Sequence, residues 1–478
     1  AVVGDRPGAR AGLALIPATR RARLVRALLV SGYELGHQPL HLASPAAALL
    51  AAGHEVRCLD LSLDRYEPEL VDWAEAVAFS VPMHTAMRLA VRAAGAVRRR
   101  RPSLPICLYG LYAPVSRDLT AGALADRIIA GEYEPALVAW VDGLGEGRGG
   151  DGASIFDLRL ERTSFRVPAR HLLPPLERYA HLALDGEERP VGYVEATHGC
   201  RHRCRHCPLP AVYDGALRVV ERDTVLADVE QLAAAGARHI TFGDPDFLNG
   251  PSHSLRIVRA MHEHLPDLTF DCTVKVEHVL DHAELWSELA AAGCLFVVTA
   301  IETLNDGILA RLDKGHTAAQ AAAAVELLRA HGIEPRPTFL PFTPWTTVDD
   351  LLELLDFVAG HDLVGNVDPV QFSLRLLVPE GSLLLDGADP ELGERLGDYD
   401  PERLSYAWTA ADPMVDLLQA RLAELTERSA AVGEAAPEAF AGVRAAVREV
   451  AGLDREPAFA IPAGSTEGRP RLTEPWFC

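Results

Sequence analysis

Short strand-like runs alternate with helical segments in two separate stretches of this chain, and no other feature constrains its fold as strongly. Five runs of the first stretch predict strands: Leu24–Tyr33, Glu55–Leu61, Ala76–Val81, Leu104–Leu111 and Arg127–Gly131. Helical segments such as Ala46–Ala52 and Ala86–Arg100 separate them. Near-continuous apolar strands are typical of a parallel sheet with helices on both faces. We therefore predict a doubly wound, Rossmann-like α/β domain over residues 23–145, with ligands at the carboxyl ends of its strands.

The second alternating stretch has a similar pattern. Six further runs predict strands: Val191–Ala196, His239–Phe242, Leu268–Val276, Leu295–Ile301, Pro337–Phe342 and Val370–Leu377. The segments between them have helical spacing, as at Val225, Val229 and Leu232. Six strand–helix units are too few to close an eight-stranded barrel but sufficient for an open, partial (β/α)6 barrel of the TIM type. We predict this half-barrel over residues 191–380, with its chemistry at the C-terminal rim of the strands.

The remaining segments differ in composition from the two alternating stretches. Residues 1–22 predict a loose N-terminal extension, and the proline-containing residues 146–190 predict a linker between the domains. Residues 381–478 predict a helical region with a cysteine-ending tail, in which Pro413–Ala431 and Pro437–Gly452 are the best helices. A chain of 478 residues exceeds the roughly 250–300 residues over which one core keeps growing, which agrees with at least two domains.

Charge and hydropathy argue against two classes of partner. The chain carries 67 acidic and 46 basic residues, and this net charge of −21 argues against binding to a nucleic-acid backbone. No apolar run reaches the ~18–20 residues needed to span a bilayer, so we expect no membrane partner. Eight cysteines are too few for a disulfide scaffold in a chain of this length, and three of them lie within eight positions. We therefore expect a reducing compartment, the cytoplasm.

Three cysteines follow the first strand of the predicted half-barrel: Cys200, Cys204 and Cys207. Three thiolates with three and then two residues between them can converge within one loop on the face of an iron–sulfur cluster. The fourth corner would then lack a protein thiolate, which leaves one iron open to another ligand. Metal binding favours the thiolate form, and nearby arginines such as Arg201 could offset the negative charge.

Two other interpretations of this motif remain open. A structural zinc site needs four ligands, and a histidine of the same segment could supply the fourth: His198, His202 or His206. A redox dithiol could also form from Cys204 and Cys207 alone, but that interpretation gives Cys200 no role.

A Cys-x-x-x-Cys-x-x-Cys motif in the loop after the first strand of such a half-barrel resembles the radical S-adenosylmethionine (SAM) enzymes over about 190 residues. The resemblance implies that Cys200, Cys204 and Cys207 hold a [4Fe-4S] cluster and that S-adenosylmethionine chelates its open iron. It also implies that an electron donor such as flavodoxin or ferredoxin drives cleavage of the sulfonium to a carbon radical, which acts on a small-molecule substrate. In this family the residue before the third cysteine lies near adenine and is often aromatic; here it is His206.

The family resemblance extends to the ends of later strands. The second strand ends in Gly243, Asp244 and Pro245, where the family often has a Gly-Gly-Glu-Pro-like segment that binds the methionine amino group. A glycine permits close approach and a carboxylate accepts an ammonium, although a plain turn could have the same residues. By its position after the fourth strand, Glu302 resembles residues that contact the ribose or carboxylate of the cofactor. For Glu302, and for Lys275 at the third strand, a rim salt bridge is an equally good interpretation.

The strand ends of the first domain resemble the cobalamin-binding domain that precedes the half-barrel in one radical SAM subgroup. The resemblance implies that six residues line the corrin pocket: Ser80, His84, Thr85, Gly110, Gly131 and Glu132. The Asp-x-His-x-x-Gly motif that supplies a cobalt ligand in other corrinoid proteins is absent, and His37 lies in the right loop without that context. Cobalamin is therefore a possible cofactor. The alternative is a Rossmann-like domain that serves only as a lid and packing partner for the half-barrel.

The final residue, Cys478, follows Glu-Pro-Trp-Phe. Residues 24–478 resemble a narrower group of radical SAM proteins named for a Cys-Sec-Ala-Glu-Pro or Cys-Cys-Ala-Glu-Pro tail, through segments such as Phe242-Gly-Asp-Pro-Asp-Phe-Leu-Asn-Gly. In that group Cys478 would be followed by selenocysteine or cysteine, so the chain looks cut where a UGA codon was read as stop. Ordinary termination is the alternative. A vicinal thiol–selenol or dithiol chelates soft centres such as arsenic(III), or acts as a reductant.

Together these features predict an oxygen-sensitive, cytoplasmic enzyme that cleaves SAM reductively and uses the radical to alkylate or otherwise modify a small molecule. Cobalamin, or a soft-element substrate held by the tail at Cys478, would be compatible with this activity. The alternative is a non-catalytic metal or corrinoid sensor.

Overall fold

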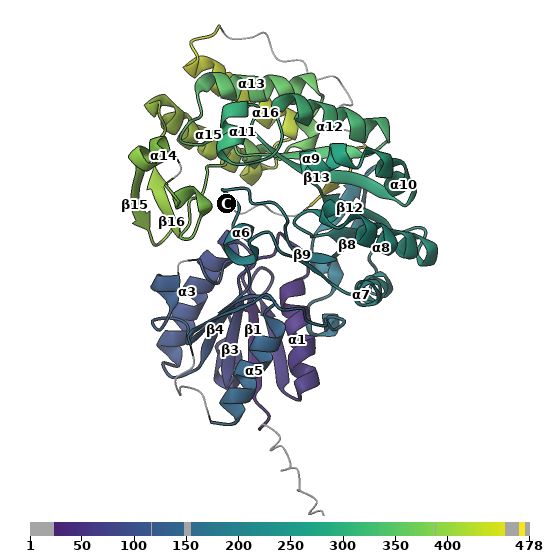
Figure 1. The fold of residues 1–478 in the computed structure, drawn as a ribbon, viewed down its shortest axis with the longest axis vertical. Coiled ribbons are helices and arrows are strands. Elements are labelled where there is room, and N and C mark those ends of the chain that lie inside the picture. Colours follow the sequence, from purple (N-terminus) through teal and green to yellow (C-terminus); the bar gives the residue numbers. More distant parts are fainter. Residues whose placement is uncertain (1–22, 116, 148–153, 388, 455–467, 474–478) are drawn as a thin grey trace, which may run out of the picture.

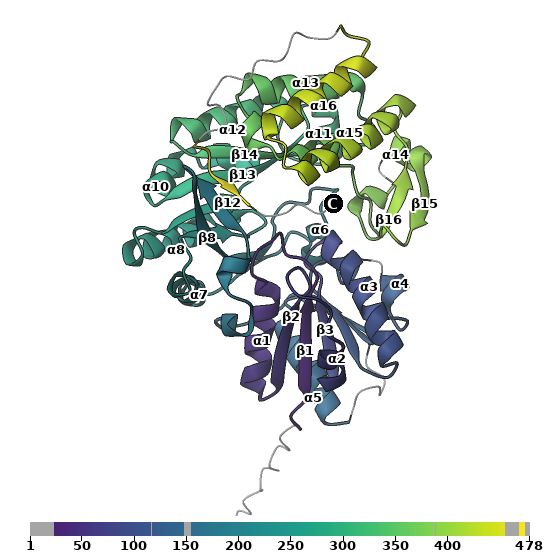
Figure 2. The same cartoon turned by 180° about the vertical axis from the view of Figure 1, so that it is seen from behind.

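The computed structural model describes residues 23–115, 117–147, 154–387, 389–454 and 468–473. The N-terminal extension predicted at residues 1–22 and the tail residue Cys478 lie outside the described residues. An N-terminal α/β unit, a half-barrel and a C-terminal helical region follow one another along the chain (Figure 1, Figure 2). The fold class predicted from the sequence is therefore confirmed.

The N-terminal unit contains a sheet of six parallel strands in the order β2-β1-β3-β4-β5-β6. Its strands are β1 (Arg26–Ser31), β2 (Glu55–Asp60), β3 (Ala76–Ser80), β4 (Ile106–Tyr109), β5 (Arg127–Gly131) and β6 (Phe156–Arg159). The first five agree with the predicted strands. β6 lies in the segment predicted as a linker, residues 146–190, and pairs with β5, so this sheet continues beyond residue 145.

Helices cover both faces of this sheet. They are α1 (Leu40–Ala52), α2 (Pro68–Trp73), α3 (His84–Arg100), α4 (Arg117–Thr120) and α5 (Glu134–Gly145). Alternate strand residues point to opposite faces, so Leu29 joins a core with α1 and α5, whereas Leu28 joins another core with α2 and α3. The same alternation separates Ala78 from Phe79 in β3. This division is the arrangement expected of a doubly wound fold.

The second sheet has seven strands in the order β14-β13-β12-β11-β8-β7-β17, and its pairs from β8 to β14 are parallel. Its strands are β7 (His181–Leu184), β8 (Glu187–Val194), β11 (His239–Phe242), β12 (Thr269–Thr273), β13 (Cys294–Glu302), β14 (Glu334–Phe339) and β17 (Arg471–Leu472). Its helices are α7 (Arg222–Ala234), α8 (Pro251–His264), α9 (Val276–Asp281), α10 (Trp286–Ala291), α11 (Asp306–Arg311), α12 (Ala318–Ala330) and α13 (Val348–Gly360). Strands and helices share one large apolar core, which makes this unit a half-barrel.

The sixth barrel strand predicted at Val370–Leu377 is wrong. The segment begins as the 3-10 helix η6 (Pro369–Ser373), and an isolated bridge joins Phe342 to Arg375. Pro369 lies in the first turn of η6, and the ring of Phe372 is buried against Phe440 of a C-terminal helix. The apolar run is thus explained by packing against helices and not by strand pairing.

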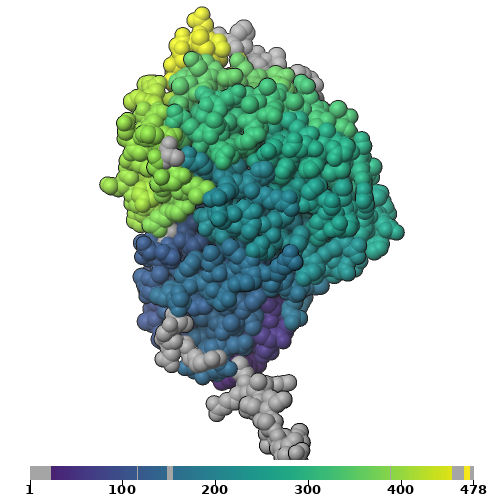
Figure 3. All heavy atoms as spheres, in the orientation of Figure 1, coloured from purple at the N-terminus to yellow at the C-terminus, as the bar shows by residue number. Residues whose placement is uncertain are grey.

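The C-terminal region combines helices with a hairpin. Its elements are α14 (Pro390–Arg395), β15 (Leu396–Asp400), β16 (Ser405–Trp408), α15 (Pro413–Val432) and α16 (Ala436–Val450). The turn of the hairpin lies against the N-terminal unit, as the space-filling view shows (Figure 3). Leu404 is buried in the core of that unit, and His84 Nε2 donates a hydrogen bond to the carbonyl oxygen of Arg403 at 2.6 Å. The hairpin therefore joins the C-terminal region to the N-terminal unit.

A buried arginine joins the N-terminal unit to the half-barrel. Arg170 lies in η1 (Arg170–Leu172) and forms an ion pair with Asp228 of α7 at 2.8 Å. Its guanidinium also donates to the carbonyl oxygens of Gln38, at 3.2 Å, and Tyr193, at 2.6 Å. The two units thus share a polar core. Over the described ranges, no helix has the length and apolar character needed to cross a bilayer.

Candidate active site

The three cysteines lie in a loop at the C-terminal end of β8. The loop begins after β9 (Thr197–Gly199), which pairs with β10 (Leu217–Val219), and it precedes α6 (Leu209–Tyr213). Gly199 has a φ of +74°, and a Cβ atom there would lie 2.3 Å from the carbonyl oxygen of Ala216. Only glycine satisfies both the left-handed backbone and the close approach. The sequence Gly199-Cys200 therefore turns the chain into the cysteine loop.

Neighbouring strands hold this loop from two sides. Asn249, in η3 (Phe247–Asn249) after β11, donates from Nδ2 to Cys200 Sγ at 3.4 Å. The backbone N–H of Arg205 donates to the carbonyl oxygen of Leu312 at 2.8 Å. The guanidinium of Arg205 is paired with Asp386 at 2.5 Å. The loop is thus positioned by the half-barrel and by the segment that leads to the C-terminal region.

The arrangement of the thiols favours a cluster over a single metal ion. Ligands of one tetrahedral zinc ion lie about 3.8 Å apart when the Zn–S bonds are ~2.3 Å long. In the part of the chain that the structure describes, Cys200, Cys204 and Cys207 do not approach one another within 4.8 Å as a group, and they form no disulfide. Burial raises the pKa of Cys204, and that of Cys207 to about 12, because a thiolate loses its hydration. The thiolate form therefore needs nearby positive charge.

Two lysines supply positive charge beside the thiols. Only two of the 46 basic residues counted as Lys and Arg are lysines, Lys275 and Lys314, and their positive charges act on Cys204. They are 8% and 3% exposed. Sequence analysis noted Lys275 but missed Lys314, although the rarity of lysine in this arginine-rich chain was a signal that could have found it. A lysine ammonium is a compact charge that a planar guanidinium does not replace.

Glu302 connects Lys314 to the cysteine loop. Its Oε1 lies 3.0 Å from Lys314 Nζ and 3.2 Å from His206 Nε2. Burial alone would raise the pKa of Glu302, but Lys314 and His206 hold it well below its usual range. Glu302 also has a φ of +67°, a left-handed conformation that is rare outside glycine. Such strain at the end of β13 is typical of functional positions.

The segment after β11 supports the base of the cysteine loop. Asp244 Oδ2 accepts a hydrogen bond from the backbone N–H of Ala196 at 2.9 Å, and Oδ1 accepts from Thr197 Oγ1 at 2.6 Å. Burial raises the pKa of Asp244 to about 7. A Cβ atom on Gly243 would lie 1.9 Å from the hydroxyl oxygen of Tyr193, so close packing requires glycine there. Contact of these residues with a cofactor stays a prediction.

A cavity of about 260 Å³ lies between the two α/β units. Gly110 and Gly131 line it from the N-terminal unit, and Gly243 and Pro245 line it from the half-barrel. It borders the cysteine loop through Gly199. Ligands of doubly wound sheets bind at the switch point in strand order, which here lies between β1 and β3.

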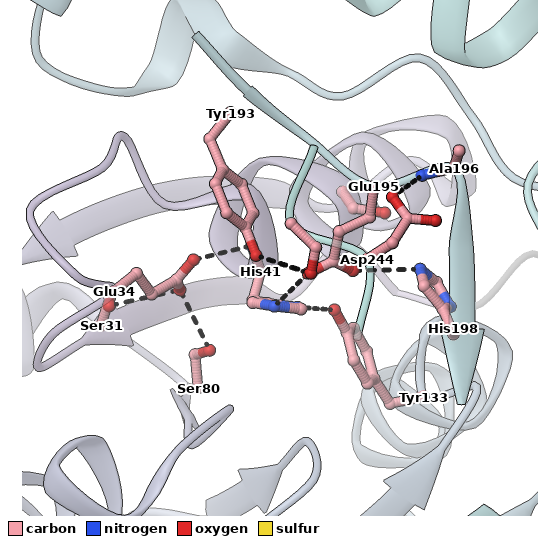
Figure 4. A network of polar contacts seen from close by, with 12 residues as sticks. Ser31, Glu34, His41, Ser80, Tyr133, Tyr193, Glu195, Ala196, His198 and Asp244 are labelled. Atoms are coloured by element: carbon pink, nitrogen blue, oxygen red, sulfur yellow. Dashed lines mark hydrogen bonds and ion pairs between the residues drawn. The ribbon is translucent and has the colours of Figure 1, made fainter. Parts of the chain in front are cut away.

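Glu34 fills that switch point. Its Oε1 accepts hydrogen bonds from Ser31 Oγ of β1 and Ser80 Oγ of β3, both at 3.4 Å (Figure 4). Burial raises the pKa of Glu34 to about 7, although His41 opposes the shift. Among the predicted corrin-pocket residues, Ser80 therefore binds Glu34, and His84 binds the C-terminal hairpin.

A chain of alternating charges crosses from one unit to the other beside the cavity (Figure 4). Glu195 of the half-barrel lies 3.3 Å from His41 Nε2 and 3.3 Å from His198 Nε2. His198 Nδ1 lies 2.9 Å from Oε2 of Glu132, which belongs to the N-terminal unit. Burial opposes these charges, but the partners outweigh it: the pKa of Glu195 falls to about 2, and those of His41 and His198 rise to about 9 and about 10.

Comparison with known proteins agrees with this architecture. Residues 194–358 match the family described as the Radical SAM superfamily. This range contains the cysteine loop, the segment after β11 and the Glu302–Lys314 pair. It is a radical SAM domain. Such domains carry a [4Fe-4S] cluster and S-adenosylmethionine, and they are domains of enzymes.

Relatives and solved structures extend the similarity to the N-terminal unit. The chain is 22% identical over 312 residues to the hopanoid C-3 methylase of Methylococcus capsulatus, an alignment that covers 62% of this chain and 59% of the methylase. The chain spans less than two thirds of the length of the curated relatives it matches. The cobalamin-dependent SAM radical enzyme OxsB, solved with aqua-cobalamin, superposes with a TM-score of 0.64 at 15% identity, covering 83% of this chain and 66% of OxsB. The radical SAM methyltransferase TsrM from Kitasatospora setae gives 0.60 at 20% identity, covering 75% of each chain. These structures share the fold of the chain.

The residues beside the cysteine loop fit a cluster and its cofactor. His206 Nδ1 is buried beside the third cysteine without a hydrogen-bond partner, so it is available to a bound group. The cavity between the units is a different matter. A cavity of ~150 Å³ holds benzene, so about 260 Å³ accommodates roughly ten non-hydrogen atoms. A second cavity of about 160 Å³ adjoins it and shares Leu35, Tyr193 and Gly243, so the space between the units extends beyond this one cavity.

Proposed function

We propose that this chain is a radical SAM enzyme that cleaves S-adenosylmethionine reductively and alkylates or otherwise modifies a small molecule. One observation carries the proposal: the rim of the half-barrel brings Cys200, Cys204 and Cys207 together with both lysines of the chain. The cluster, when bound, supplies the electron that breaks the sulfonium bond. An external donor of the flavodoxin or ferredoxin type would have to provide that electron.

The chain's own residues prepare the site for this chemistry. Lys314 and Lys275 lower the cost of holding buried thiolates, because their charges act on Cys204. Glu302 keeps Lys314 in place and presents His206 to the space beside the third cysteine. Asn249 donates to Cys200 Sγ and so orients the first thiolate. These contacts leave the loop ordered before any ligand binds.

We propose the cavity between the units as the substrate site. Its size suits a compact molecule, and its walls combine apolar groups such as Met83 and Leu209 with the carboxylate of Glu195. A substrate that fills the cavity would displace water from it, which would protect a carbon radical from quenching. Cobalamin is a second candidate at this interface, supported by the fold shared with OxsB. We assign no step to it.

The C-terminal tail is a further part of the proposal. β17 pairs with β7, and Thr473 donates its backbone N–H to the carbonyl oxygen of His181 at 2.8 Å. Cys478 follows Thr473 by five positions, a reach of at most about 18 Å in an extended chain. We propose that a thiol at Cys478, alone or followed by selenocysteine or cysteine, presents a soft-element substrate such as arsenic(III). Equal product yields in single turnovers of the wild type and a Cys478→Ser variant would discard this role.

Anaerobic reconstitution followed by mass spectrometry of SAM products tests the main proposal. Dithionite-reduced wild-type protein should yield a cleaved SAM fragment and show the absorbance of an iron–sulfur cluster. A variant with all three loop cysteines replaced by alanine should show neither. Cys294→Ala is the matched control, because this thiol is buried in β13 outside the loop. A protein that binds its cluster but leaves SAM intact would be a metal or corrinoid sensor instead.

A further inference from the structure

Two histidines and an aspartate converge beside the cysteine loop, and the function proposed above does not use them. His202 lies within the loop, Asp246 precedes η3 after β11, and His278 lies in α9 after β12. One ligand atom of each lies within 4.8 Å of the other two. Within the described ranges, no other group of three or more histidine, cysteine, aspartate or glutamate side chains meets that distance.

Direct contacts link the three side chains of this group. Asp246 Oδ2 lies 2.7 Å from His278 Nδ1, an ion-pair distance, and both atoms are buried. The Asp246 side chain is 0% exposed, and its other oxygen accepts from the backbone N–H of Leu248 at 3.1 Å, which fixes its direction. A buried carboxylate needs positive charge close by, which either a protonated His278 or a bound cation supplies.

The second histidine completes the arrangement. His202 Nε2 lies 3.2 Å from His278 Nε2, a separation that two nitrogen ligands of one ion also have when each lies ~2.0–2.1 Å from it. On its other side, His202 Nδ1 lies 3.6 Å from Glu277 Oε2, and Lys275 Nζ holds the same oxygen at 3.3 Å. A carboxylate behind a histidine is the usual outer partner of a metal-binding imidazole.

We propose that His202, Asp246 and His278 bind one divalent transition-metal ion of the zinc or iron(II) class, separate from the cluster. Two imidazoles and one carboxylate are a ligand set that both ions accept, with positions left open for water. The ion binds one carboxylate oxygen of Asp246 and one ring nitrogen of each histidine. The ion also connects the cysteine loop to the segments that follow β11 and β12, and so stabilises the position of this loop.

Equilibrium dialysis of the cluster-loaded protein against zinc chloride, followed by elemental analysis, tests the site. Wild-type protein should retain one zinc per chain in addition to its cluster iron. Asp246→Asn, which changes one oxygen to nitrogen, and His278→Ala should each lower zinc retention at least tenfold. His264→Ala is the matched control, because this histidine is exposed on α8 and should leave zinc retention unchanged.

Thermal unfolding gives a second readout that does not depend on activity. Zinc should raise the unfolding temperature of the wild type and of the His264→Ala variant, and it should not change that of Asp246→Asn. No zinc in the wild type, or equal zinc in wild type and Asp246→Asn, would overturn the proposal. Displacement of zinc by saturating SAM would assign these residues to the cofactor and would overturn it as well.

Discussion

Replacing Lys314 by methionine removes the ammonium from the buried pair with Glu302. The two charged atoms lie 3.0 Å apart, and the side chains are 4% and 11% exposed. Truncating one partner of a buried ion pair costs about 3–5 kcal/mol, because the remaining charge is left without compensation. His206 Nε2 lies 3.2 Å from the same oxygen and compensates in part, so we expect a loss near the lower end, about 3 kcal/mol.

Anaerobic thermal unfolding measures this loss. For a unit of the half-barrel's size, about 3 kcal/mol corresponds to a fall of roughly 6–12 °C in unfolding temperature. Adding Glu302→Gln to Lys314→Met removes the uncompensated charge, so the double variant should recover much of the loss. The unfolding temperatures of these variants should be measured with and without the cluster, because the Lys314 ammonium also acts on the cysteine thiols.

The other lysine provides the internal control. Lys275 Nζ lies 3.3 Å from Glu277 Oε2, but the Glu277 side chain is 36% exposed and therefore screened by water. Lys275→Met should cost no more than about 1 kcal/mol through this pair. Equal losses for the two lysine variants, or strictly additive effects of Lys314→Met and Glu302→Gln, would refute the buried-pair reasoning.

Three further changes should have measurable effects. Gly199→Ala should destabilise the cysteine loop by more than about 2 kcal/mol and lower cluster iron after reconstitution, because its Cβ would lie 2.3 Å from a backbone oxygen. Gly186→Ala is the control: it has the same unfavourable positive φ but no neighbouring atom, so it measures the cost of the backbone conformation without the clash. Raising the pH from 7 to 10 should destabilise the folded chain, because folding raises the pKa of His198 to about 10. The charged imidazolium stabilises the fold fully below pH 6.5, and this stabilisation is lost as the pH rises through 10. Urea unfolding at pH 7 and at pH 10 measures the loss. Arg170→Met should cost about 3–5 kcal/mol in urea unfolding because it removes the cation beside the buried Asp228 carboxylate, to which the Gln231 amide still donates at 2.7 Å.

Each of these has a contrary outcome. Equal iron content in Gly199→Ala and Gly186→Ala would mean that the loop does not need its close turn. A urea midpoint that rises between pH 7 and pH 10 would contradict the charged state of His198. For Arg170→Met, restoration of stability by Asp228→Asn is expected, and its absence would mean that the arginine acts through its carbonyl contacts instead.

The strands could be predicted because the pattern of buried and exposed side chains within each strand depends on only a few neighbouring residues. The run at Ala76–Val81 is covered by helices on both faces, and that at His239–Phe242 packs Ile240 and Phe242 against helices on one face, so the pattern of each run is local information. Val370–Leu377 has the same apolar character for another reason. Its residues are buried by α15 and α16, which lie more than 40 residues later in the chain. A short apolar run does not reveal which partner buries it.

Site residues were predictable where chemistry depends on spacing within one loop. The cysteines at positions 200, 204 and 207 are of this kind, and their role as cluster ligands stays a prediction. Lys314 and Glu132 are not, because their partners are distant in sequence: Lys314 reaches back to Glu302 across α11, and Glu132 reaches His198 in the other unit. The expected role of Glu132 in a corrin pocket came from resemblance alone, and nothing in its local sequence indicates an ion pair between units.

The ion pairs between units also restrict how any ligand reaches the cavity. His198 lies between Glu132 of the N-terminal unit and Glu195 of the half-barrel, and all three side chains are mostly buried. Moving the units apart would break one of these contacts and leave a buried charge uncompensated, which costs about 3–5 kcal/mol. A large ligand such as a corrinoid would have to repay that cost through its own contacts. A compact substrate that enters beside Gly199 would leave the pairs intact, so the electrostatics of the interface favour the smaller ligand.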